Sequence, residues 1–119
     1  KFVILLIVFS LLFFFGVIVA SAWNPNNPAS VEDYIHYIAG KEKVNVSMVL
    51  SIAKCESGIR ANAIGDKGKS FGVFQIYLPA HPYITKEQAL NPWFNINWAI
   101  DRMAEGKWNM WSCYKNMWP

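Results

Sequence analysis

The sequence predicts a small, mainly α-helical domain with one short extended insertion, preceded by an apolar export segment. Two observations predict the helices: apolar residues recur at helical spacing in separate stretches, and capping residues or glycines stand at their ends. A third observation, a short aromatic segment at residues 71–77 between glycine-rich and proline-rich stretches, predicts the extended insertion. With 119 residues, the chain is long enough for one domain.

The N-terminal segment, residues 1–22, has the layout of a secretory signal peptide. An almost unbroken apolar run at residues 2–20 follows Lys1 and precedes a small-residue pattern that favours cleavage after Ala22. The run is also long enough to cross a bilayer as a helix, so a retained membrane anchor is the alternative. Both interpretations export the rest of the chain.

A linker and a first helix follow. Residues 23–30 are rich in Pro and Asn and predict a linker, with the folded domain at residues 31–119. Ser30 is suited to cap the first helix, and Gly40 to end it. His36 lies off the apolar stripe and is expected to face solvent. That stripe consists of Val31, Tyr34, Ile35 and Ile38.

The second helix is expected to start near Asn45 or Ser47 and to run to about Glu56. Gly58 is well placed just past its end. Glu56 therefore falls in the last turn, where the helix dipole disfavours a carboxylate. The ordinary interpretation of such a Glu is a solvated surface charge. The buried stripe is expected to consist of Val46, Val49, Leu50 and Ala53.

The middle of the chain predicts little regular structure. Residues 59–70 have no sustained apolar pattern and predict a loop, whereas residues 71–77 predict a strand-like segment or a tight turn entering a helix. Thr85 and Gln88 form a capping box that predicts a short helix.

A longer helix is expected after Asn91, with Pro92 at its first position and Gly106 at its end. Residues 107–119 are rich in Trp and are expected to be irregular and pinned by Cys113. The core face of the helix is expected to consist of Trp93, Ile96, Ile100 and Met103.

Charge and aromatic content narrow the function classes. The formal net charge of +3 includes Lys1, so the exported part is only mildly basic, which argues against nucleic acid and is compatible with an anionic wall polymer. The tryptophans supply core volume that a small domain needs, or a groove that stacks on sugars. All six follow the apolar run: Trp23, Trp93, Trp98, Trp108, Trp111 and Trp118.

Cys55 and Cys113 are most simply a disulfide, because an even cysteine count in an exported small domain favours pairing. Closing so long a loop stabilises the fold by about 4 kcal/mol. The alternative is a reactive Cys55 nucleophile with His36 or His81 as its base.

Glu56 is the candidate general acid. Such a group must stay protonated at its working pH, so its pKa must rise. The helix C-terminus and an apolar, aromatic surround favour that rise, and the nearest cations in the sequence are Lys54 and Arg60.

Glycosidic cleavage usually uses two carboxylates. Asp66 is the nearest second candidate, but its glycine neighbours favour a turn residue. Asp101 and Glu105 are expected to face solvent. One acid without a clearly placed partner predicts a reaction in which the substrate supplies the nucleophile.

A set of motifs follows in a definite order along the chain: CESG at 55–58, Asn62-Ala63, GVFQI at 72–76, Pro79, Asn95-Ile96 with Ala99, and Trp108 with WSC at 111–113. Together these motifs resemble the soluble lytic transglycosylase family of the lysozyme-like superfamily, and the resemblance covers about residues 44–114. The Cys before the acid and the late W-x-C also resemble resuscitation-promoting factors, which share that fold.

The resemblance implies cleavage of the β-1,4 bond between N-acetylmuramic acid and N-acetylglucosamine, with a 1,6-anhydro product. Glu56 would be the general acid and base, Ser57 would shape the surroundings of Glu56, Gln75 would hydrogen-bond the substrate, and Phe74 and Tyr77 would line the groove. No cofactor or metal is implied. The implied partner is the peptidoglycan glycan strand, outside the cytoplasm, with a monomeric protein and with membrane contact only through an uncleaved apolar segment.

The sequence also departs from the family pattern. Phe74 stands where Met is frequent, and neither Tyr83 nor Tyr114 sits in a convincing motif for the late Tyr of many transglycosylases. The residues around Asp66 resemble goose-type lysozymes, but the second Asp of those hydrolases would fall at Tyr77. A hydrolytic muramidase and a non-catalytic wall-binding module that uses its Trp residues are therefore the alternatives.

Overall fold

The computed structural model describes residues 28–119, so the predicted signal peptide or anchor and most of the predicted linker lie outside the described residues. No helix in this part of the chain is long and apolar enough to cross a membrane. The mainly α-helical class is confirmed. The helices are α2 (Pro28–Lys41), α3 (Val46–Ser57), α4 (Lys86–Leu90), α5 (Pro92–Ala104) and α6 (Ser112–Met117), joined by strands β1 (Ile64–Gly65), β2 (Ser70–Phe71) and β3 (Ile76–Tyr77) and by single 3-10 turns η1 (Leu78–Ala80) and η2 (Trp108–Met110).

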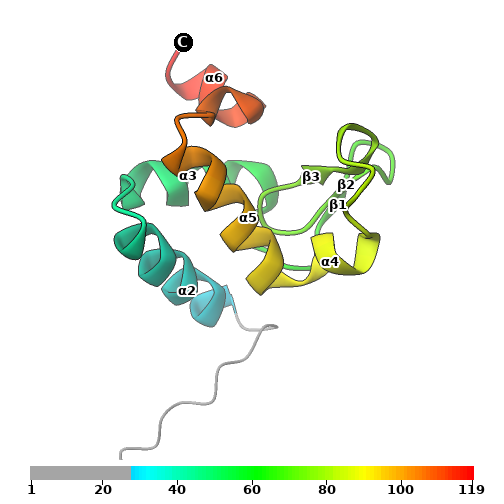
Figure 1. The fold of residues 1–119 in the computed structure, drawn as a ribbon, viewed down its shortest axis with the longest axis horizontal. Helices are drawn as coiled ribbons and strands as arrows, with labels where there is room; N and C mark the ends of the chain where they lie inside the picture. The colour runs from blue at the N-terminus through cyan, green and yellow to red at the C-terminus, as the bar shows by residue number, and fades with distance from the viewer. Residues whose placement is uncertain (1–27) are drawn as a thin grey trace, which may run out of the picture.

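The helices and the sheet occupy opposite sides of the domain. Helix α2 packs against α3 and α5, whereas the small sheet lies on the other side of α5 next to α4 (Figure 1). One core cluster runs from the apolar faces of these three helices into the loop between β2 and β3, where Val73 and Phe74 are fully buried. The core therefore couples the helices to the loop that follows β2.

Helix α3 begins and ends as predicted. The Asn45 side chain accepts a hydrogen bond from the Met48 N–H, and Gly58 adopts a left-handed φ of 64°. The Gly58 N–H donates to the carbonyls of Ala53 and Lys54. This cap places Glu56 in the last turn. Of the predicted stripe, Val49 and Ala53 are buried and Val46 and Leu50 are partly buried, and Ile52 is buried in addition.

Helix α2 starts earlier than predicted. It begins at Pro28, so Ser30 lies inside the first turn instead of capping it. The difference arises because Pro is tolerated in the first turn of a helix, where its missing N–H has no partner to lose. Val31, Ile35 and Ile38 are buried and His36 is exposed, as the stripe predicted.

Residues 59–77 contain a small antiparallel sheet in the order β1-β2-β3. The prediction of a loop at 59–70 misses β1 and the start of β2, because strands of two residues carry no periodic signal. Residues 71–77 are a hairpin whose tight turn spans residues 72–75. Ser70 pairs with Gly65 on one side and with Tyr77 on the other.

The capping predictions for the later helices are confirmed. Thr85 and Gln88 form a capping box at α4, and the Asn91 side chain accepts from the Trp93 and Phe94 N–H groups at α5. Trp93 differs from the prediction, because it is 37% exposed and packs edge-on against Tyr34, with ring centroids 3.9 Å apart.

The C-terminal tail is ordered instead of irregular. Residues 107–119 contain η2 and α6. A short segment of this kind lacks a sustained apolar period, and its position depends on the Cys55–Cys113 disulfide and on Trp111. Figure 1 shows α6 beyond the ends of α3 and α5, at the C-terminal end of the described chain.

Candidate active site

Glu56 lies at a pocket of about 260 Å³ between the end of α3, the sheet and α6. The pocket mixes two carboxylates with aromatic side chains, which suits a ligand with both polar and apolar faces. Its lining residues are Glu56, Asp66, Ser70, Gln75, Ile76, Tyr77, His81, Trp98, Met110, Trp111, Ser112 and Lys115.

The surroundings of Glu56 raise its pKa above the ordinary value. Burial of the half-buried carboxyl is the largest cause, and the negative charge of Asp66 adds to it. The Cys113 N–H opposes the rise by donating a hydrogen bond to Glu56 Oε1 at 3.3 Å. Because the raising effects dominate, the pKa shift is in the direction that a general acid needs.

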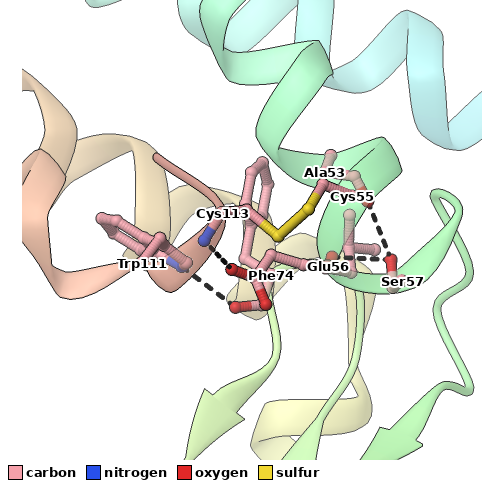
Figure 2. Close-up of a disulfide and its surroundings, with 8 residues drawn as sticks. Ala53, Cys55, Glu56, Ser57, Phe74, Trp111 and Cys113 are labelled. Atoms are coloured by element: carbon pink, nitrogen blue, oxygen red, sulfur yellow. Dashed lines mark hydrogen bonds between the residues drawn. A yellow bond between two sulfur atoms is a disulfide. The ribbon is translucent and has the colours of Figure 1, made fainter. Parts of the chain in front are cut away.

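The disulfide between Cys55 and Cys113 joins the last turn of α3 to the start of α6 across 58 residues of sequence. Figure 2 shows the bond beside Glu56, with the Cys113 N–H directed at the carboxyl. The described residues contain no free cysteine. The alternative of a Cys55 nucleophile is therefore wrong, and the pairing prediction is confirmed.

The tight turn at residues 72–75 is fixed by side chains from three separate elements. Ser57 Oγ donates to the Val73 carbonyl at 2.7 Å, and Trp111 Nε1 donates to the Phe74 carbonyl at 3.0 Å (Figure 2). Asn95 Oδ1 accepts from the Phe74 N–H at 2.8 Å. The turn thus has little freedom beside the acid.

Asn95 is fully buried and bonds to three backbone groups. In addition to the Phe74 N–H, its Nδ2 donates to the carbonyls of Phe71 at 3.0 Å and Ala89 at 2.8 Å. Gly72 makes this approach possible, because a Cβ there would stand 2.4 Å from both the Ala89 carbonyl and Asn95 Nδ2.

The residues expected to bind substrate separate into two groups. Gln75 and Tyr77 line the pocket, and Tyr77 is 42% exposed. Ser57 and Phe74 are buried and do not line the pocket: the Ser57 hydroxyl bonds to the turn, and the Phe74 ring packs in the core. The Ser57 hydroxyl already donates its proton to the Val73 carbonyl.

The nitrogen of the Gln75 side-chain amide already makes hydrogen bonds within the protein. Its Nε2 donates to the carbonyls of Ala63 at 3.2 Å and Gly72 at 2.9 Å. The Gln75 backbone has a left-handed φ of 48°, which turns this side chain back across the sheet toward Gly65. Among the described residues the amide oxygen accepts no hydrogen bond, so it is the atom of Gln75 that remains for a ligand.

Asp66 is both a turn residue and a pocket residue. Its φ of 49° places it in a left-handed turn conformation, while its carboxylate lines the same pocket as Glu56 and accepts a hydrogen bond from Ser70 Oγ. Asp101 and Glu105 are exposed, as predicted. Neither Tyr83 nor Tyr114 lines the pocket.

One wall of the pocket is a chain of aromatic rings. The sequence offered its tryptophans for a groove that stacks on sugars, but it singled out neither Trp98 nor His81 for this site. His81 meets Trp98 edge-on at 4.8 Å, Trp98 meets Trp111 at 6.4 Å, and the Arg102 guanidinium lies 4.1 Å from the Trp98 ring. Burial, aided by Arg102, lowers the pKa of His81. The sequence signal that could have identified Trp98 is its spacing on α5, which places this side chain on the core side of the helix, close to the pocket.

No metal-binding arrangement of three or more His, Cys, Asp or Glu side chains occurs in residues 28–119. The pocket holds several groups that can carry a proton, and among them Glu56 is the one whose pKa is raised by burial.

Comparison with known proteins places this geometry in a family. The family model described as "Transglycosylase SLT domain" matches residues 33–113, which is more than half of the chain. No curated protein and no solved structure gave a match. Because the matched span contains Glu56, the turn at residues 72–75 and both cysteines, the chain belongs to the SLT transglycosylase family, whose activity on peptidoglycan is of the lytic transglycosylase type.

Proposed function

We propose that the protein cleaves the β-1,4 bond between N-acetylmuramic acid and N-acetylglucosamine in peptidoglycan and forms 1,6-anhydro-muramic acid ends. The observation that carries the proposal is a half-buried Glu56 with a raised pKa at a pocket lined by aromatic and polar side chains. The family supports peptidoglycan as the substrate, and hence a location outside the cytoplasm, with which the disulfide is consistent.

In the first step, the Glu56 carboxyl gives its proton to the glycosidic oxygen as the bond from that oxygen to C1 of the muramoyl residue breaks. The resulting Glu56 carboxylate then accepts the proton of the C6 hydroxyl, and O6 bonds to C1. One proton leaves Glu56 and one returns, so no water is consumed. The Cys113 N–H stabilises the carboxylate between the two transfers, because it donates to Oε1.

The other site residues bind or position. Gln75 offers its amide oxygen to a sugar amide or hydroxyl, and Tyr77 offers an exposed ring to a sugar face. Ser57 and Phe74 act indirectly, because the Ser57 hydroxyl bonds to the turn on which Gln75 stands and the buried Phe74 ring anchors that turn in the core. The domain at residues 31–119 is proposed to act as a monomer, with membrane contact only through residues 2–20 if that segment is retained.

A hydrolytic muramidase is the second candidate, and the position of Asp66 favours it. A second carboxylate in the pocket of the acid is the arrangement with which glycosidases activate water. In that case the product would carry a reducing end, and Asp66 would take the proton of the attacking water.

The test is product analysis of purified, oxidised protein incubated with peptidoglycan, with Glu56→Gln and Asp66→Asn in parallel. Mass spectrometry distinguishes anhydro ends from reducing ends by the mass of one water. Anhydro products that disappear with Glu56→Gln would support the transglycosylase, and reducing ends lost with Asp66→Asn would support the hydrolase. No products from the wild-type protein would leave a non-catalytic wall-binding module.

A further inference from the structure

A second hollow, of about 410 Å³, adjoins the active-site pocket at the tip of the β1–β2 hairpin. It is lined by Asp66, Lys67, Lys69 and Tyr77. Asp66 and Tyr77 also line the pocket of Glu56, so the two hollows adjoin at these residues and are together called the groove. A polymer that occupies the pocket can therefore extend into the second hollow.

Two ammonium groups define the charge of this hollow. Lys67 and Lys69 are both exposed, and neither has a carboxylate partner, since the ion pair found in residues 28–119 joins Lys107 to Glu105. The Asp66 carboxylate, which lines both hollows, accepts a hydrogen bond from Ser70. The hollow thus presents two lysines without an ion pair and one carboxylate beside the exposed ring of Tyr77.

The backbone under these lysines is fixed and, at Lys67, strained. Asp66 and Lys67 have consecutive left-handed φ angles of 49° and 56°, and the Gly68 N–H donates to the Gly65 carbonyl at 3.0 Å. Such a turn favours Gly at its second central position. The turn itself therefore gives no reason for a lysine at 67, which costs conformational energy where it stands.

Lys69 is held on both sides of its peptide. Its N–H donates to the Gly65 carbonyl and its own carbonyl accepts from the Leu78 N–H, both at 3.0 Å. Both side chains consequently start from a backbone that is anchored to the sheet beside Tyr77, while their exposed ammonium groups can move to meet a ligand. Two cations at one end of the pocket suit a polymer that carries an anionic group there.

We propose that this hollow is a subsite for a carboxylate of the peptide carried by the glycan strand, bound by Lys67 and Lys69 while Tyr77 contacts the adjoining sugar ring. The proposal rests on the proposed function, because it takes the glycan strand to lie in the pocket of Glu56. The substrate class is then the peptide-bearing glycan strand, in preference to bare glycan.

The test compares Lys67→Gly/Lys69→Gln with the matched control Lys41→Gln/Lys43→Gly. Lys43 also has a left-handed φ, of 55°, and neither Lys41 nor Lys43 lines the groove. Both double variants thus remove two cations and relieve one strained lysine. Both carry Glu56→Gln in addition, so that Kd for soluble, sonicated peptidoglycan is measured by tryptophan fluorescence without turnover.

We expect the groove variant to bind about five-fold more weakly than the Glu56→Gln parent at low ionic strength, and the control to bind like the parent. The difference should shrink with added salt, because exposed charges are screened. Equal weakening by both double variants, or none by the groove variant, would overturn the proposal. Thermal unfolding of both variants verifies that each is folded.

Modified substrates identify the anionic group. Amidation of all carboxylates with carbodiimide and ammonia should abolish the difference between parent and groove variant. Peptidoglycan from which an amidase has removed the peptides keeps only its lactyl carboxylates, and the parent and the groove variant should bind it equally well. A difference in Kd that persists with this substrate would overturn the assignment to the peptide. If the wild-type protein forms no anhydro products in the separate activity assay, the proposed function is rejected. The ratios of the Kd values would still show whether Lys67 and Lys69 bind the peptide carboxylate.

Discussion

Glu56 is balanced between groups that act on its pKa in opposite directions. Burial and the charge of Asp66 raise this pKa, and the Cys113 N–H lowers it. Since the acid step needs the protonated form, activity is expected to fall as the pH rises through the raised pKa of Glu56. The neighbours of this one residue therefore determine at which pH the basic limb of the activity profile lies.

Asp66→Asn should shift that basic limb to lower pH. The substitution removes a negative charge that raises the pKa of Glu56, so the pKa falls and the protonated form is lost earlier as the pH increases. The pH dependence of kcat/KM measures the shift, with Asp101→Asn as the control because Asp101 is exposed and lies outside the Glu56 pocket. A shift to higher pH would contradict the assigned role of Asp66.

Asn95→Ala is expected to destabilise the fold by about 3 kcal/mol. It leaves the Phe74 N–H and the carbonyls of Phe71 and Ala89 buried without their partner. Urea unfolding measures the loss, and Asn116→Ala, at an exposed position of α6, should change stability by less than about 0.5 kcal/mol. Similar losses for both variants would show that the three bonds contribute little.

At the scale of the element, the turn at residues 72–75 depends on the absence of a side chain at Gly72. Gly72 has a φ of 80°, and a Cβ there would overlap the Ala89 carbonyl and Asn95 Nδ2. Gly106 has a similar φ of 82° but open space around it. The two glycines therefore separate backbone strain from steric overlap.

Gly72→Ala should cost at least about 2 kcal/mol more than Gly106→Ala. The Gly106 variant meets only the left-handed strain, about 1 kcal/mol, whereas the Gly72 variant must also displace a backbone carbonyl and a buried amide. Paired urea titrations measure the difference. Equal costs would mean that the turn moves aside without loss, and activity of the Gly72 variant would then be unaffected as well.

The helices were predictable from the sequence because their caps and apolar periods are local signals. Asn45, Gly58 and the box of Thr85 and Gln88 all act where the sequence predicts them. The two-residue strands carry no period, and α6 is placed by a covalent bond to a distant residue, so neither could be read locally.

The candidate site was predictable only in part, for a related reason. Glu56 and Gln75 belong to motifs and line the pocket, as does Tyr77 just after one of them. Ser57 and Phe74 belong to the same motifs but are buried behind the pocket. Membership in a motif therefore does not tell whether a side chain contacts the pocket or supports the backbone behind it. Trp98, His81 and Lys115 reach the pocket from elements whose relative placement depends on tertiary packing.

On the scale of the whole molecule, the disulfide connects the acid to the far end of the chain. It brings Cys113 N–H to Glu56 and holds the segment that supplies Trp111, Ser112 and Lys115 to the pocket. Closing this 58-residue loop contributes about 4 kcal/mol. That is a large share of the 5–15 kcal/mol typical of a domain, so stability and site geometry depend on the same bond.

Cys55→Ser/Cys113→Ser, or reduction of the wild-type protein, should therefore lower the unfolding free energy by about 4 kcal/mol and weaken activity before the domain unfolds. Release of the α6 segment removes the Cys113 N–H from the Glu56 carboxyl and takes Trp111, Ser112 and Lys115 away from the pocket, so the substrate loses one side of its site. Urea unfolding, and kcat/KM measured below the unfolding transition, report the two effects. Activity that is lost only together with the fold would show that the disulfide stabilises the domain without placing α6 at the acid.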